Sequence, residues 1–148
     1  MHRGWRVAAL AVVLANAGWL RADLKQAMAE PNLEKRSKLA LDNASAAYQS
    51  ARSAYDSGEN EKVSAAAVEI IESVDLAYTS LMKTGKDPRK SPKWFKQAEI
   101  ETRTLLRRIE TFQQQMNFTD RDLLDKTKAK VQQVHDDLLV GLMEGKHK

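Results

Sequence analysis

The chain has 148 residues, of which 43% are hydrophobic and 30% are charged, and its formal net charge is +4. This length accommodates a single domain, and a charge so close to neutral gives little support to nucleic-acid binding by the molecule as a whole. The absence of cysteine excludes disulfide bonds, thiolate nucleophiles, cysteine-ligated zinc and covalent c-type haem attachment.

The beginning of the chain has the three-part pattern of a secretory signal peptide. Arg3 and Arg6 make a short positive segment, and an unbroken apolar run over residues 7–14 follows it. Ala15 and Ala17 then supply the small residues that signal peptidase needs before the cut. The pattern predicts cleavage after Ala17.

A second candidate cut follows Ala22, so the predicted signal peptide covers residues 1–22 and the mature domain covers residues 23–148. The alternative is a membrane anchor, but the apolar run has 14 residues even when it is extended to Leu20, whereas a bilayer needs about 20. Removal of residues 1–17 leaves 22 basic and 20 acidic residues. We expect an exported protein, periplasmic or secreted, with no transmembrane span in the mature chain.

Four long amphipathic helices are predicted after a short helical turn that begins at Leu24 and ends at Pro31. Their apolar residues recur at steps of three and four, which are typical of a helix and not of a strand. The first helix, over residues 32–57, has an alanine-rich inward face that lets a neighbouring helix approach closely. The four inward faces comprise Leu33, Ser37, Ala40, Ala44, Ala47, Ala51 and Ala54; Val63, Ala67, Ile70, Val74, Ala77 and Leu81; Phe95, Ala98, Thr102, Leu105, Ile109, Phe112 and Met116; and Leu124, Thr127, Val131, Val134, Leu138 and Leu142.

Residues that favour caps and turns mark the ends of these helices. Asn60 is expected to cap the second helix, and Gly85 is placed for a left-handed C-cap at its end. Ser91 followed by Pro92 is expected to start the third helix, and Thr119 the fourth. Two short connections and one longer one predict two antiparallel hairpins in an all-α, up-down-up-down four-helix bundle. An extended pair of hairpins, as in helical repeat proteins, is the alternative.

The turn between the first two helices resembles that of a tetratricopeptide repeat. Tyr55 and Gly58 stand before the second helix and small residues follow along it, so that the resemblance covers residues 44–78. It departs from the family at Asn60, where an aromatic residue is expected, and the second hairpin does not repeat the pattern. The resemblance implies a protein-binding scaffold. As a whole the chain is similar in style to small exported helical proteins of bacteria, a likeness that implies no activity.

The sequence carries no catalytic motif. It has no phosphate-binding glycine-rich loop, no Gly-x-Ser-x-Gly elbow and no His-Glu-x-x-His pair. None of the histidines, His2, His135 and His147, belongs to the Glu-x-x-His pairs that hold metals inside bundles, and His135 is expected at the boundary of the core or facing solvent. We therefore predict no catalytic residue, no metal ligand and no cofactor, so the protein is not expected to be an enzyme. The carboxylates are interpreted as surface charges near bases, for example Glu61, Glu69 and Glu72.

A local cluster of positive charge occupies residues 83–96. Six basic residues there face a single acidic residue, Asp87, and Trp94 and Phe95 lie among them. Such a segment can bind anionic lipid or a cell-wall polyanion, with Trp94 stacking or inserting. The alternative is a solvated loop that Trp94 and Phe95 fix to the end of the bundle. The candidate binding residues are Lys83, Lys86, Arg89, Lys90, Lys93, Trp94 and Lys96.

These observations predict an exported, non-catalytic helical module of the cell envelope, which is structural or binds a protein partner. The alternative function is a surface binder of anionic lipid or cell-wall polyanion through residues 83–96. A bundle that holds a small ligand or metal between its helices is a third hypothesis. Export argues against nucleic acid as a partner.

Overall fold

The computed structural model describes residues 24–145, and this part of the chain is helical with no strand, which confirms the all-α prediction. The predicted signal peptide over residues 1–22 lies outside it. A short helix over residues 24–29 comes first. The elements that follow are α2 (Leu33–Asp56), α3 (Asn60–Lys83), α4 (Lys93–Gln115), the 3₁₀ helix η1 (Phe118–Leu124) and α5 (Asp125–Glu144).

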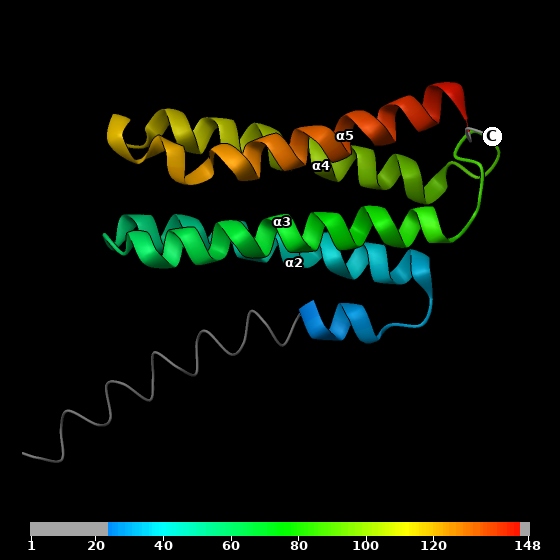
Figure 1. Cartoon of the computed structure of the whole chain (residues 1–148), viewed down its shortest axis with the longest axis horizontal. Helices are drawn as coiled ribbons and strands as arrows, with labels where there is room; N and C mark the ends of the chain where they lie inside the picture. The colour runs from blue at the N-terminus through cyan, green and yellow to red at the C-terminus, as the bar shows by residue number, and fades with distance from the viewer. Residues whose placement is uncertain (1–23, 146–148) are drawn as a thin grey trace, which may run out of the picture.

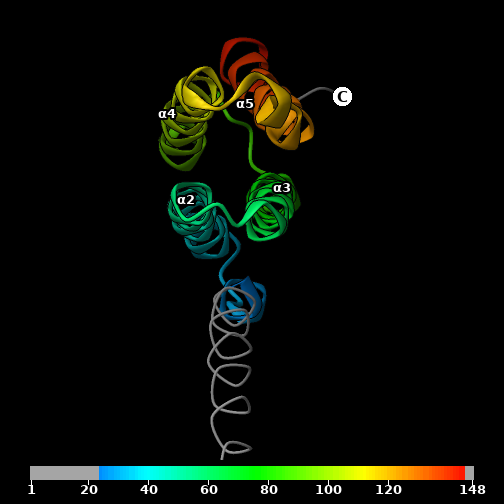
Figure 2. The same ribbon diagram turned by 90° about the vertical axis from the view of Figure 1, so that its left-hand side faces the viewer.

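The four long helices form two antiparallel hairpins, stacked in two layers (Figure 1). One layer pairs α2 with α3 and the other pairs α4 with α5, while α2 packs on α4 and α3 packs on α5 between the layers (Figure 2). Lys38 contacts Glu101, and Arg52 contacts Gln115 further along both helices, so α2 and α4 run in the same direction. Parallel helices therefore face each other across the two layers.

The predicted inward faces form the core. Every residue predicted to face inward is buried except Leu33 and Leu142, which are half-buried. Between α2 and α3 the contact is built largely from alanine, since Ala40, Ala44, Ala47 and Ala51 have no exposed surface. Small side chains let the two backbones approach without leaving voids. This confirms the close approach that the sequence predicts.

A buried polar cluster joins α2 to α3 among these alanines. The Asn43 Nδ2 group donates to Glu69 Oε1 at 2.9 Å and to Ser73 Oγ at 2.8 Å, and the Ser73 hydroxyl donates to the Glu69 carbonyl oxygen at 2.7 Å. The interpretation of Glu69 as a surface charge is therefore wrong: only 7% of it is exposed, because it lies on the side of α3 that faces α2. A shift of one helix along the other would leave these buried groups without partners, so the cluster favours one register.

Two of the predicted helix starts are displaced. The N-cap of α3 is Glu59 and no side chain caps it, because the Asn60 amide donates instead to Asp120 Oδ1 at 3.4 Å. The cap of α4 is Pro92, again without a side-chain hydrogen bond, in place of the expected Ser91. At Asn60 the cap is lost to a contact with a distant segment, which the local sequence does not reveal.

The connection between α4 and α5 also differs from the prediction. Thr119, expected to begin the fourth long helix, lies in η1, and α5 begins at Asp125. The left-handed C-cap at Gly85 is confirmed by its φ of 68°. Across the described part of the chain, no helix is both long and apolar enough to cross a membrane.

Candidate functional site

The basic segment lies at one end of the stacked hairpins, where α3 is connected to α4 (Figure 1). Its residues come from the last turn of α3, the connection over residues 84–92 and the first turn of α4. The start of α2 and the end of α5 reach the same end, as the contacts of Lys86 with Glu34 and of Arg89 with Gly145 indicate. We call this region the basic end.

The connection at the basic end is packed onto α5. Pro88 is buried, and its Cγ lies 3.3 Å from the point that a Cβ on Gly141 would occupy. Gly145 is equally close to the loop. A Cβ on Gly145 would lie 3.1 Å from both Asp87 Oδ1 and Arg89 Cδ. A Cβ at either position would crowd the loop, and the φ of 81° at Gly145 is a conformation that favours glycine. Gly141 in α5 and Gly145 at its C-cap thus let the connection lie directly on the helix end.

Hydrogen bonds within the connection fix its shape. Asp87 Oδ1 accepts from the backbone N–H of Arg89 at 2.9 Å, and the Asp87 carbonyl oxygen accepts from the N–H groups of Lys90 and Ser91 at 3.1 and 2.9 Å. A side chain that bonds to the backbone two residues on is typical of a tight turn at aspartate. The cations of this loop are therefore carried by an ordered backbone.

Most cations of the basic end have no ion pair within residues 24–145. Lys86 is the exception, since its Nζ bonds to Glu34 Oε1. The Nζ of Lys93 lies over the Trp94 ring, 5.2 Å from its centroid. The exposed cations that make no ion pair in the described part of the chain are Lys83, Arg89, Lys90, Lys93 and Lys96.

The two aromatic residues of the segment pack inward. Phe95 is 2% exposed, and Trp94 is partly buried against the hydrophobic core. Their placement fits the alternative in which these residues fix the segment to the bundle. A partly buried ring with Lys93 over its face holds the first turn of α4 in place. The candidate surface therefore consists of the cations, while Trp94 packs against the core beneath them.

Exposed apolar side chains accompany the cations. Met82, in the last turn of α3, is 43% exposed, and near the end of α5 Val140 and Met143 are 42% and 69% exposed. Apolar side chains beside unpaired charge are typical of surfaces that contact another molecule. None of these three residues belongs to the predicted inward faces, and no motif in the sequence marked them as part of a binding surface.

The opposite end of the hairpins carries the opposite charge. Residues 56–62 and 117–126, which form it, contain six acidic residues and three basic ones. Its polar groups bond to one another: the Tyr55 hydroxyl donates to Asp120 Oδ2 at 3.1 Å and accepts from the Asn117 N–H at 2.8 Å. We call this region the acidic end. The molecule is thus electrically polar along its length.

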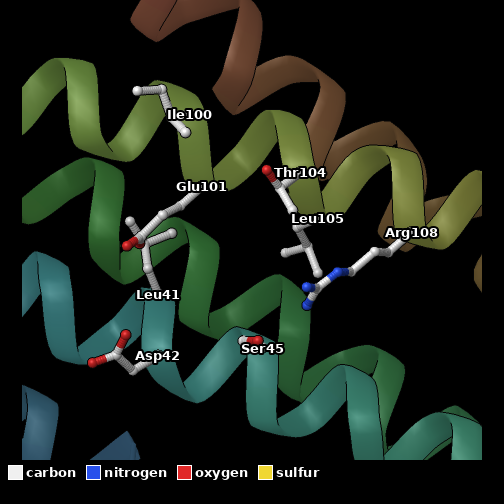
Figure 3. A pocket seen from close by; sticks show the side chains of 8 residues that line it. All are labelled: Leu41, Asp42, Ser45, Ile100, Glu101, Thr104, Leu105 and Arg108. Carbon is white, nitrogen blue, oxygen red and sulfur yellow. The ribbon is translucent and has the colours of Figure 1, made fainter.

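A groove opens between α2 and α4, on the side where the two layers meet (Figure 3). Its volume is about 220 Å³. The sequence did not reveal it, because it depends on the pairing of α2 with α4 across the layers. It is lined by Leu41, Asp42, Ser45, Ile100, Glu101, Thr104, Leu105 and Arg108.

His135 lies at the boundary of the core, on α5. Its Nε2 is 3.1 Å from Glu99 Oε1 and its Nδ1 is 3.3 Å from Asp136 Oδ1. Within residues 24–145, no three or more histidine, aspartate or glutamate side chains are grouped as a metal site would require. The other two histidines lie outside the described residues.

No protein-family model matches the chain, and no curated protein matches it.

Proposed function

We propose that the protein is an exported, non-catalytic helical module of the bacterial cell envelope, which binds an acidic surface of a protein partner through its basic end. The observation that carries this proposal is a group of exposed cations without ion pairs in the described part of the chain, two of them on a loop that is packed onto the end of α5 and the others in the helix turns beside it. An ordered loop loses little conformational freedom when it binds, and unpaired charge steers an oppositely charged partner.

The proposal treats residues 1–22 as a cleaved signal peptide and residues 23–148 as one domain, an up-down-up-down bundle of two hairpins. The positive, apolar and small-residue segments of the leader support export. The four buried faces and the stacked hairpins support a single packed domain. The absence of a recognisable catalytic motif from the sequence supports a binding role over a catalytic one.

The test is chemical crosslinking in the native envelope, followed by purification of the chain and identification of what is attached. We expect a mature chain that begins at Gly18 or Asp23, crosslinked to a specific protein. A variant with Lys86, Arg89, Lys90 and Lys93 each replaced by Glu should lose that adduct. The matched control replaces Lys62 and Lys126, near the acidic end, by Glu and should keep it. An unprocessed chain in the cytosol, or an adduct that the four reversals leave unchanged, would contradict the proposal.

A second candidate function is the binding of anionic lipid or of a cell-wall polyanion. The exposed Met82 and Met143 favour it, since apolar side chains beside cations are suited to the interface of a bilayer with negative headgroups. Co-sedimentation with phosphatidylglycerol vesicles, or with isolated wall polymer, should decrease as salt is raised and should be lost in the four-site variant. Binding to neutral vesicles, or binding that survives the four reversals, would exclude this candidate.

A further inference from the structure

The groove between α2 and α4 has an apolar floor and a partly apolar edge (Figure 3). Leu41 and Leu105 form the floor, and each is only 6% exposed. Ile100 stands at the edge with half of its surface exposed. Ser45 and Thr104 are small, so another helix can approach closely at the middle of the groove.

One end of the groove is acidic. The ammonium group of Lys38 bonds to Asp42 and also lies 3.3 Å from Glu101 Oε1. The hydrogen bond to Asp42 is the main reason that the pKa of Lys38 is raised, and Glu101 raises it further. Two carboxylates share this one cation, so the three side chains together keep one negative charge.

The other end of the groove is basic. Arg108 is exposed and has no ion pair in the described part of the chain. The Arg108 side chain reaches back along the groove, so that its guanidinium group lies beside Leu105 (Figure 3). Glu101 and Arg108 are seven residues apart on α4, which is two helical turns or about 10 Å along one face. The midpoint between them falls at Thr104 and Leu105.

This spacing makes the groove complementary to itself. A rotation of 180° about an axis through the midpoint exchanges the positions of Glu101 and Arg108, so a second α4 laid antiparallel on the first sets each arginine opposite a glutamate. A two-fold interface uses the same surface on both copies, and closes without leaving a free site. Arg108 gains a partner in this arrangement, and Ile100 of each copy lies against the apolar stem of the other copy's arginine.

We propose that a second copy of the chain occupies this groove, with α4 antiparallel to α4 and Arg108 of each copy paired with Glu101 of the other. The dimer uses one side of the hairpins and leaves the basic end free. It is therefore independent of the partner proposed above, and its test measures self-association and not partner capture.

Charge reversal at these two positions gives a stringent test, read by sedimentation velocity of the purified protein. The wild-type protein should be a dimer. Arg108→Glu alone and Glu101→Arg alone each place like charges opposite one another, and we expect each to weaken dimerisation about tenfold or more. Mixing the two variants restores both pairs, so a heterodimer should form, and the double variant should again form a homodimer.

Two controls keep the result interpretable. Lys126→Glu changes charge on α5, away from the groove, and should leave the dimer unchanged. Circular dichroism of each variant separates a lost interface from a lost fold, and the restored heterodimer itself requires folded chains. A monomeric wild-type protein at every concentration, or a dimer that both single reversals leave intact, would overturn the proposal.

Discussion

The two ends of the hairpins differ in where their polar groups are directed. At the acidic end the Tyr55 hydroxyl bonds to both the Asp120 carboxylate and the Asn117 N–H, and the Tyr55 ring meets Phe112 edge-on. At the basic end five exposed cations, Lys83, Arg89, Lys90, Lys93 and Lys96, make no ion pair within residues 24–145. Groups that bond inward stabilise the fold, whereas groups that remain unpaired are available to a partner. This difference supports the proposal that the basic end is the surface for binding, and it predicts that the acidic end contributes more to the stability of the fold.

The largest loss of stability is expected at Phe112, beneath the acidic end. Its ring is 1% exposed and meets Tyr48 and Tyr55 edge-on, at centroid distances of 6.0 and 5.6 Å. Phe112→Ala leaves a cavity in this contact and should reduce the free energy of unfolding by about 3–5 kcal/mol, measured by urea denaturation. Phe118→Ala is the matched control, because its side chain is 84% exposed and its removal should change stability little.

The backbone turns at the two ends should lose equal stability when their glycine is replaced by alanine. Gly58, at the acidic end, and Gly85, at the basic end, have φ of 72° and 68°, and no atom lies within 4 Å of a Cβ built on either. Replacement of either by Ala imposes the left-handed conformation on a side chain, at a loss of about 1–2 kcal/mol. If Gly58→Ala and Gly85→Ala lose equal stability in thermal melts, the backbone turns at the two ends are equivalent, and the ends differ only in their side chains. A markedly larger loss at Gly85 would contradict this comparison.

A smaller loss is expected from Tyr55→Phe, which removes one hydroxyl and two hydrogen bonds at the acidic end. We expect the free energy of unfolding to fall by about 1 kcal/mol. Tyr78→Phe is the control, as the Tyr78 hydroxyl makes no hydrogen bond with the described residues and its removal should be nearly neutral. Indistinguishable stabilities of the two variants would show that the bonds at the acidic end do not stabilise the fold.

The smallest effect on stability is expected from the four reversals at the basic end. Among Lys86, Arg89, Lys90 and Lys93, only Lys86 has an ion pair with another of the described residues, and that pair is at the surface. The free energy of unfolding should therefore change by no more than about 1 kcal/mol, while binding is lost. A variant that unfolds cooperatively at nearly the wild-type urea concentration and still loses its partner would separate binding from folding. Extensive unfolding would mean that these cations maintain the fold.

Most of the fold could be predicted from the spacing of apolar residues. The residues of α3 and α4 that were expected to face inward are buried without exception, because a helical period of 3.6 fixes which side chains share a face. The alanine-lined contact of α2 with α3 follows from the same pattern. Features that depend on contacts between distant segments could not be predicted. Asn60 bonds to Asp120 instead of capping α3, and Glu69 is buried because Asn43 faces it from another helix.

The candidate site was predicted in composition but not in geometry. The cluster of lysines and arginines is visible in residues 83–96, whereas the packing of Pro88 on Gly141 brings together segments that are 53 residues apart in the sequence. The sequence likewise gives no sign that Lys86 is paired with Glu34 while Lys90 makes no ion pair with the residues that the structure describes. The groove between α2 and α4 was missed for the same reason, since helical periodicity does not state which helices pair across layers.

The most direct test of the account compares the two ends in the living cell. A photo-crosslinking amino acid is placed at Lys90 in one strain and at Glu61, in the first turn of α3 at the acidic end, in another. The account predicts a specific, salt-sensitive adduct from position 90 and none from position 61. Adducts of equal yield from both positions, or an adduct from position 61 alone, would contradict the claim that the protein binds through its basic end.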